Sequence, residues 1–134
     1  MRGFLFLALL GIIPLLYYNV AHTEADEGEV EAVVESYYGY LRVGDTAGIL
    51  SLLTEPLLSE RRELLEKNTA YPQFLREMYK SSYMEVTDIK KVKGNRRAVD
   101  VEIYLDEGQN PLKTRFILQI VNGSWKISNE VDQS

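Results

Sequence analysis

This sequence shows no recognisable catalytic signature, although it contains 20 Asp and Glu residues and nine Tyr residues. Acid–base catalysis uses carboxylate, imidazole or phenol side chains that point into a pocket. The chain has one histidine, His22, and no cysteine, so thiol chemistry and disulfide bonds are excluded. His22, Glu24 and Asp26 carry donor atoms for a metal ion, but a solvated acidic linker is the favoured interpretation. We therefore predict no metal site and no cofactor.

Asp45 is the best single carboxylate for a remote acid, because it follows a segment rich in tyrosine. The favoured interpretation is structural, since aspartate directly before a helix accepts hydrogen bonds from the free N–H groups of the first turn. We expect Asp45 to cap a helix.

Aromatic side chains are the candidates for a ligand pocket, and core packing is the alternative role for each. Tyr37, Tyr38 and Tyr40 are close enough in sequence to present phenol groups from one helix. The pocket candidates are Tyr38, Tyr79, Phe116 and Trp125. The inward faces of the last two strands are expected to be apolar, formed by Phe116, Leu118, Ile120, Trp125 and Ile127. We expect no catalytic base on these strands and assign no catalytic residue.

A basic run lies in the distal half of the chain. Its members are Lys90, Lys91, Lys93, Arg96 and Arg97. Such a surface patch could contact anionic lipid headgroups or an acidic partner. The favoured alternative is a solvated hairpin whose lysines discourage pairing at the sheet edge. The net charge of −5 argues against a nucleic-acid partner.

Residues 1–23 are expected to be a signal peptide or a membrane anchor. Residues 3–21 carry no charge, and a helix of that length spans roughly 28 Å, close to a bilayer core. No clean cleavage site follows, so an anchor and a cleaved signal both remain open. In either case Arg2 stays in the cytoplasm, and the domain is exported, either anchored in the membrane or periplasmic or secreted.

The exported part divides into an acidic linker over residues 24–29 and one domain over residues 30–132. Apolar residues from Val30 to Leu41 follow the period of an amphipathic helix that ends at Gly44. Shorter helices are expected after Asp45, Pro56 and Pro72.

After Lys80 the period changes from helical to alternating. Strands are expected over Tyr83–Val92, Arg97–Leu105, Leu112–Val121 and Ser124–Val131. Gly94-Asn95 and Asn122-Gly123 suit tight hairpin turns. Helices followed by an antiparallel meander predict an α+β domain.

The order of these pieces resembles the nuclear-transport-factor-2-like (cystatin-like) superfamily. "VVESYYGYLRVGDTAGILSLL" is similar to its opening helix pair, and "TRFILQIVNGSWKIS" resembles its closing strands. Small exported bacterial domains of unknown function are the most similar members. The resemblance implies a cone of three to four helices packed on a curved antiparallel sheet, often with a pocket, and a homodimer formed through the sheet.

This fold carries many activities, so it does not select one. We expect a non-catalytic domain of the bacterial envelope that holds a small apolar ligand or docks an envelope protein. The alternative is an isomerase- or cyclase-like enzyme, which requires a buried Asp or Tyr with a perturbed pKa in the pocket.

Overall fold

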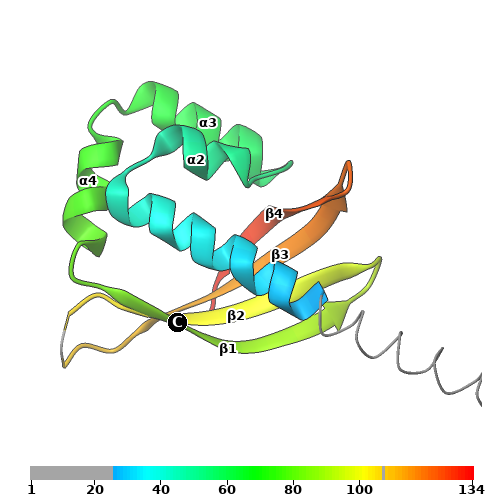
Figure 1. Ribbon diagram of the computed structural model, residues 1–134. Helices are drawn as coiled ribbons and strands as arrows, with labels where there is room; N and C mark the ends of the chain where they lie inside the picture. The colour runs from blue at the N-terminus through cyan, green and yellow to red at the C-terminus, as the bar shows by residue number, and fades with distance from the viewer. Residues whose placement is uncertain (1–25, 107) are drawn as a thin grey trace, which may run out of the picture.

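Four helices cover one face of a four-stranded sheet in the computed structural model, which describes residues 26–134 except residue 107. A long helix occupies residues 26–43, followed by α2 (Thr46–Ser51), α3 (Leu57–Lys67) and α4 (Tyr71–Tyr79). The sheet consists of β1 (Tyr83–Val92), β2 (Arg96–Tyr104), β3 (Leu112–Val121) and β4 (Ser124–Asp132). All neighbours are antiparallel in the order β1-β2-β3-β4. The predicted α+β architecture is confirmed (Figure 1).

The predicted signal or anchor segment, residues 1–23, lies outside the described residues. Within residues 26–134, apart from 107, no helix has the length and apolar character that crossing a bilayer requires. Residues 26–29, expected to be a linker, are instead helical and continuous with the long helix. Side-chain contacts hold this turn against the sheet, because Asp26 pairs with Arg97 and Glu29 accepts a hydrogen bond from Trp125.

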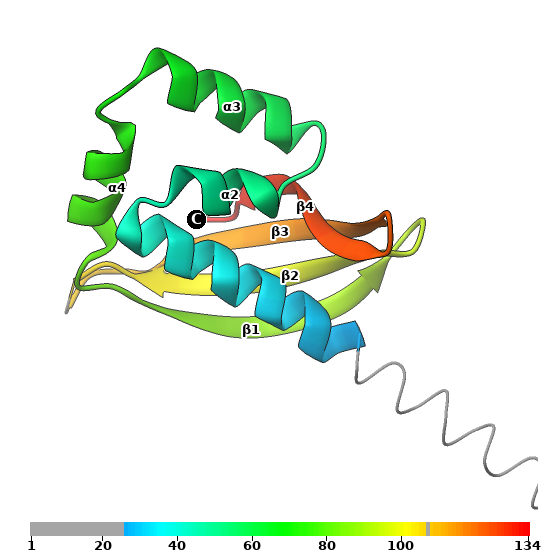
Figure 2. The ribbon, with the colours of Figure 1, turned by 45° about the horizontal axis from the view of Figure 1, so that its top comes forward.

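The long helix packs on the inner face of the sheet through the predicted apolar stripe. Val30, Val34 and Tyr37 are fully buried. They meet the inward side chains of all four strands in one hydrophobic core. The helix ends where predicted, at Gly44, whose φ of 69° is left-handed. Figure 2 shows α4 at this end of the helix, where the chain turns back toward β1.

Both predicted hairpin turns are confirmed. Gly94 and Asn95 have φ values of 80° and 59°, and Asn122 and Gly123 have φ values of 52° and 83°. Positive φ at both turn positions matches the twist of the flanking strands, which explains the Asn and Gly residues.

The sheet carries two β-bulges, each with a hydroxyl residue as the extra residue. Thr87 interrupts the β1–β2 register, and Ser128 interrupts the β3–β4 register. Thr87 Oγ1 donates to the Asp100 carbonyl at 3.2 Å, and Ser128 Oγ donates to the Ile117 carbonyl at 3.2 Å. A bulge bends its strand and moves the residues beyond it to the opposite face.

Gly44→Ala and Gly39→Ala should change stability in opposite directions. A Cβ on Gly44 would lie 2.6 Å from the Pro72 carbonyl oxygen in a left-handed conformation, so we expect a loss of about 2 kcal/mol. Gly39 lies in the long helix with nothing within 4 Å of its added Cβ, so alanine there should stabilise by about 0.5–1 kcal/mol. Denaturant unfolding measures both, and a neutral Gly44→Ala variant would contradict the packing described at this turn.

Candidate functional site

A cavity of about 210 Å³ lies between the long helix, α4 and the inner face of the sheet. Four of its lining residues have aliphatic or aromatic hydrocarbon side chains: Leu41, Ile103, Leu112 and Phe116. The others supply oxygen atoms: Tyr79, Thr114, Glu130 and Asp132. Mixed lining of this kind, an apolar wall with a few polar groups, is typical of small-molecule sites.

The bulge at Ser128 brings the two carboxylates into this cavity. Ile117 pairs with Asn129 and the next residue, Leu118, pairs with Ile127, so Ser128 is the unpaired extra residue. Trp125 and Ile127 are buried before the bulge, and after it the solvent-exposed Glu130 and Asp132 line the cavity. The prediction that these strands present only apolar residues inward is therefore wrong. Ile120 is also 55% exposed, although an inward core position was expected.

Glu130 belongs to a polar network that joins α3, β4 and the long helix. Arg61 of α3 forms an ion pair with Glu130 of β4. The other guanidinium nitrogen, Arg61 Nη1, donates to the Tyr37 hydroxyl of the long helix at 2.8 Å. Tyr37 is fully buried, and its ring meets Phe116 edge-on at 5.6 Å between centroids. The network gives the buried Tyr37 hydroxyl a hydrogen-bond partner that it would otherwise lack.

The phenol groups near Glu130 are held in their neutral form. Burial, followed by the negative charge of Glu130, raises the pKa of Tyr37 above its ordinary value. The same two causes raise the pKa of Tyr79 to about 12. Both phenols are therefore protonated near neutral pH, and the Tyr37 hydroxyl accepts its hydrogen bond from Arg61. An efficient general acid needs a pKa near the working pH, so these shifts do not favour catalysis by tyrosine.

Two larger hollows lie outside the interface between helix and sheet. One, of about 420 Å³, is lined by Glu102, Asn110, Pro111, Lys113, Gln133 and Ser134. The other, of about 450 Å³, lies between α2, α3 and α4. We prefer the smaller cavity because it alone among these three adjoins the Tyr37–Arg61–Glu130 network.

Comparison with known proteins identifies the fold. No protein-family model matches the chain, and no curated protein matches it. A solved NTF-2-like protein of unknown function from Silicibacter pomeroyi superposes with a TM-score of 0.58 at 16% identity, covering 83% of this chain and 97% of that one. A domain of unknown function with a cystatin-like fold from Nostoc punctiforme gives a TM-score of 0.57 at 14% identity, covering 81% and 76%. This chain has the nuclear-transport-factor-2-like, or cystatin-like, fold.

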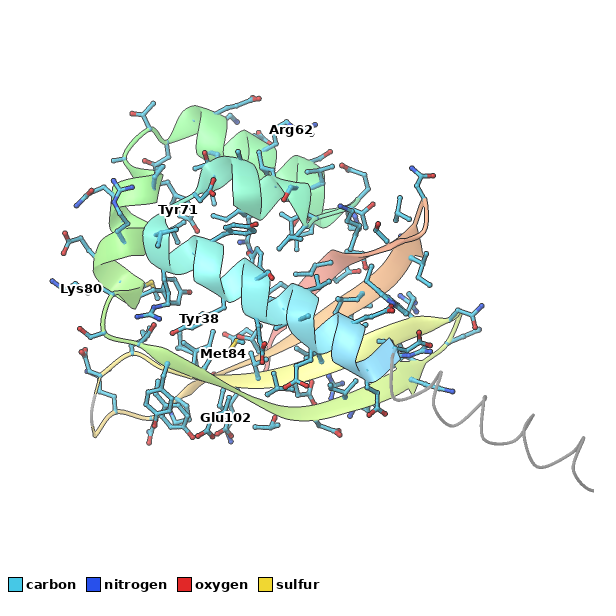
Figure 3. The ribbon with its side chains drawn as sticks, viewed as in Figure 1. Tyr38, Arg62, Tyr71, Lys80, Met84 and Glu102 are labelled. Carbon is cyan, nitrogen blue, oxygen red and sulfur yellow. The ribbon has the colours of Figure 1, made fainter. Side chains whose placement is uncertain are left out.

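Within this nuclear-transport-factor-2-like fold, the four predicted pocket residues fall into two places. Tyr79 and Phe116 line the cavity. Tyr38 lies next to it, because its ring meets Tyr79 edge-on at 6.1 Å and its hydroxyl bonds Ser82. Figure 3 shows Tyr38 between the long helix and the sheet, with Glu102 on the opposite face.

Trp125 lies apart from that cavity, beside the first described turn of the long helix. Its indole N–H donates to Glu29 at 3.1 Å, and the Arg97 guanidinium stacks on its ring at 5.3 Å. Trp125 therefore anchors the helix, and its neighbours Asp26, Glu29 and Arg97 form a separate polar hollow.

The remaining predicted residues have structural partners. Asp45 caps α2 by accepting a hydrogen bond from the Gly48 N–H at 2.9 Å, as expected. His22 lies outside the described residues. Among residues 26–134 other than 107, no group of three His, Asp or Glu side chains could hold a metal ion.

The basic run does not form one continuous patch. Arg97 is only 9% exposed and lies between Asp26 and Trp125. Lys90 lies 3.7 Å from Asp88 and 3.9 Å from Asp100 on the outer face. Lys91 and Lys93 are exposed, and Arg96 donates to the Lys93 carbonyl within the hairpin turn.

Tyr79→Phe should reduce the loss of stability at alkaline pH. The pKa of Tyr79 is raised from 10.0 to about 12, so the unfolded chain releases this proton first as the pH rises. The contribution of the Tyr79 phenol to the free energy of unfolding is complete below pH 10 and is lost as the pH rises towards 12. The phenylalanine variant lacks this contribution, which is under about 1.4 kcal/mol per pH unit. Denaturant unfolding across this pH range measures the difference, and identical losses in both proteins would contradict the assigned burial.

Proposed function

We propose that this domain is a non-catalytic binding domain that holds a small, largely apolar molecule in the cavity between α4 and the sheet. The observation that carries the proposal is the composition of the cavity, in which an apolar wall faces fixed polar groups. Its volume of about 210 Å³ is below the roughly 300–1,000 Å³ of pockets for drug-sized ligands, so the ligand is small.

The rigid setting of the polar groups supports binding. Glu130 is held by Arg61, which is itself held by Tyr37. A group whose partners are fixed before the ligand arrives loses little conformational entropy on binding.

The proposal places the domain outside the cytoplasm, in the envelope. The support comes from the sequence, in which residues 3–21 are uncharged and follow Arg2. Membrane anchoring through these residues, docking of an envelope protein and a homodimer formed through the sheet stay predictions.

An isomerase- or cyclase-like enzyme is the second candidate, and one observation favours it. Glu130, Asp132 and Tyr79 all line the cavity, which gives carboxylate and phenol groups to one site. The raised pKa of Tyr79 opposes a role as general acid near neutral pH. We therefore rank binding above catalysis.

Native mass spectrometry of the full-length chain, purified from its own envelope under gentle conditions, tests the binding proposal. We expect a small added mass that disappears on denaturation and is lost in a Phe116→Trp variant, because the larger ring fills the cavity that Phe116 lines. The same spectrum reports a dimer or a bound protein. A bare chain in every preparation, or an added mass that the Phe116→Trp variant retains, would reject the cavity as the binding site.

A further inference from the structure

The polar groups of the cavity select a class of ligand. Its lining contains two carboxylates, Glu130 and Asp132, and the hydroxyl groups of Thr114 and Tyr79. None of its lining residues is lysine, arginine or histidine. The cavity is therefore rich in hydrogen-bond acceptors and has no basic side chain on its wall.

One basic side chain lies close by, and its charge is already matched. Arg61 pairs with Glu130 and donates to Tyr37, so its charge offsets that of Glu130. The remaining charge on the cavity wall is that of Asp132, so the cavity carries one net negative charge. The Asp132 carboxylate accepts a hydrogen bond from the Ser134 N–H at 2.9 Å, which fixes one oxygen and leaves acceptor capacity on the other.

The neighbours of Asp132 suit an ammonium group. Thr114 is directly opposite Asp132 in the β3–β4 ladder, so its hydroxyl oxygen lies beside the carboxylate as a second acceptor. Tyr79 lines the same cavity, and the face of a phenol ring attracts a cation. The hydrocarbon side chains of Leu41 and Phe116 provide the surface for an apolar body.

We infer that the ligand is a small organic cation, a primary or secondary amine with a compact apolar body, whose ammonium group binds Asp132 and Thr114. This inference rests on the proposed function, because it names the chemistry of the molecule that the cavity holds.

Three probes of one size and different charge test the inference: benzylamine, benzyl alcohol and benzoate. Titration of the full-length chain followed by NMR should give binding in the order benzylamine, benzyl alcohol, benzoate. Asp132→Asn should weaken benzylamine binding by about 2- to 5-fold, since an ion pair with an exposed carboxylate contributes of that order, and should leave benzyl alcohol unchanged.

Asp88→Asn is the matched control, because it removes the same charge from the outer face of β1, where Asp88 pairs with Lys90. Benzylamine binding should persist in this variant. Equal binding of all three probes would overturn the amine inference and leave the proposed function standing. No binding of any probe would overturn the inference as well, and the native mass spectrum then decides separately whether the cavity holds another molecule.

Discussion

One extra residue in β4 determines which side chains meet inside this fold. Ser128 is 2% exposed and anchored to the Ile117 carbonyl. Because side chains alternate along a strand, this single insertion turns Glu130 and Asp132 from the outer face to the inner face. Glu130 can then reach Arg61 on α3, and Arg61 reaches Tyr37 on the long helix. The polar part of the cavity and the ion pair between α3 and β4 both depend on that bulge.

The two ends of the long helix have different roles. At one end Asp26 and Glu29 bind Arg97 and Trp125, which fixes the helix on the hairpin end of the sheet. At the other end the helix stops at Gly44, and α4 lies beside it (Figure 2). The cavity forms at this second end, where Leu41 and Tyr79 face β3 and β4. The contacts that anchor the helix and the cavity that we propose as a binding site thus lie at different ends of one helix, so a change at Trp125 should leave the cavity in place.

Most of the fold could be predicted from local chemistry. The Gly44 helix end, the Asp45 cap and the two Asn/Gly turns each follow from the conformational preference of one or two residues. The bulges could not be predicted, because Thr87 and Ser128 are ordinary strand residues whose extra position depends on the partner strand. Unbroken alternation from Trp125 and Ile127 would place Glu130 on the outer face. For this reason the sequence alone predicts a wholly apolar inner face for the last two strands. The site also needs Arg61, which lies 69 positions before Glu130, and no local pattern links residues so far apart. The sequence signal available was the exchange of apolar for acidic residues after Ile127, at Glu130 and Asp132.

The most direct test of the bulge is a double-mutant cycle between Arg61 and Glu130. Arg61→Met, Glu130→Gln and the double variant are unfolded in denaturant, and the coupling energy is obtained from the four free energies of unfolding. The inward position of Glu130 predicts a coupling of about 1–3 kcal/mol, well above the few tenths of a kcal/mol expected for the exposed pair Glu63–Lys67 within α3. A coupling no larger than that of the surface pair would contradict the inward position and, with it, the acidic wall of the cavity.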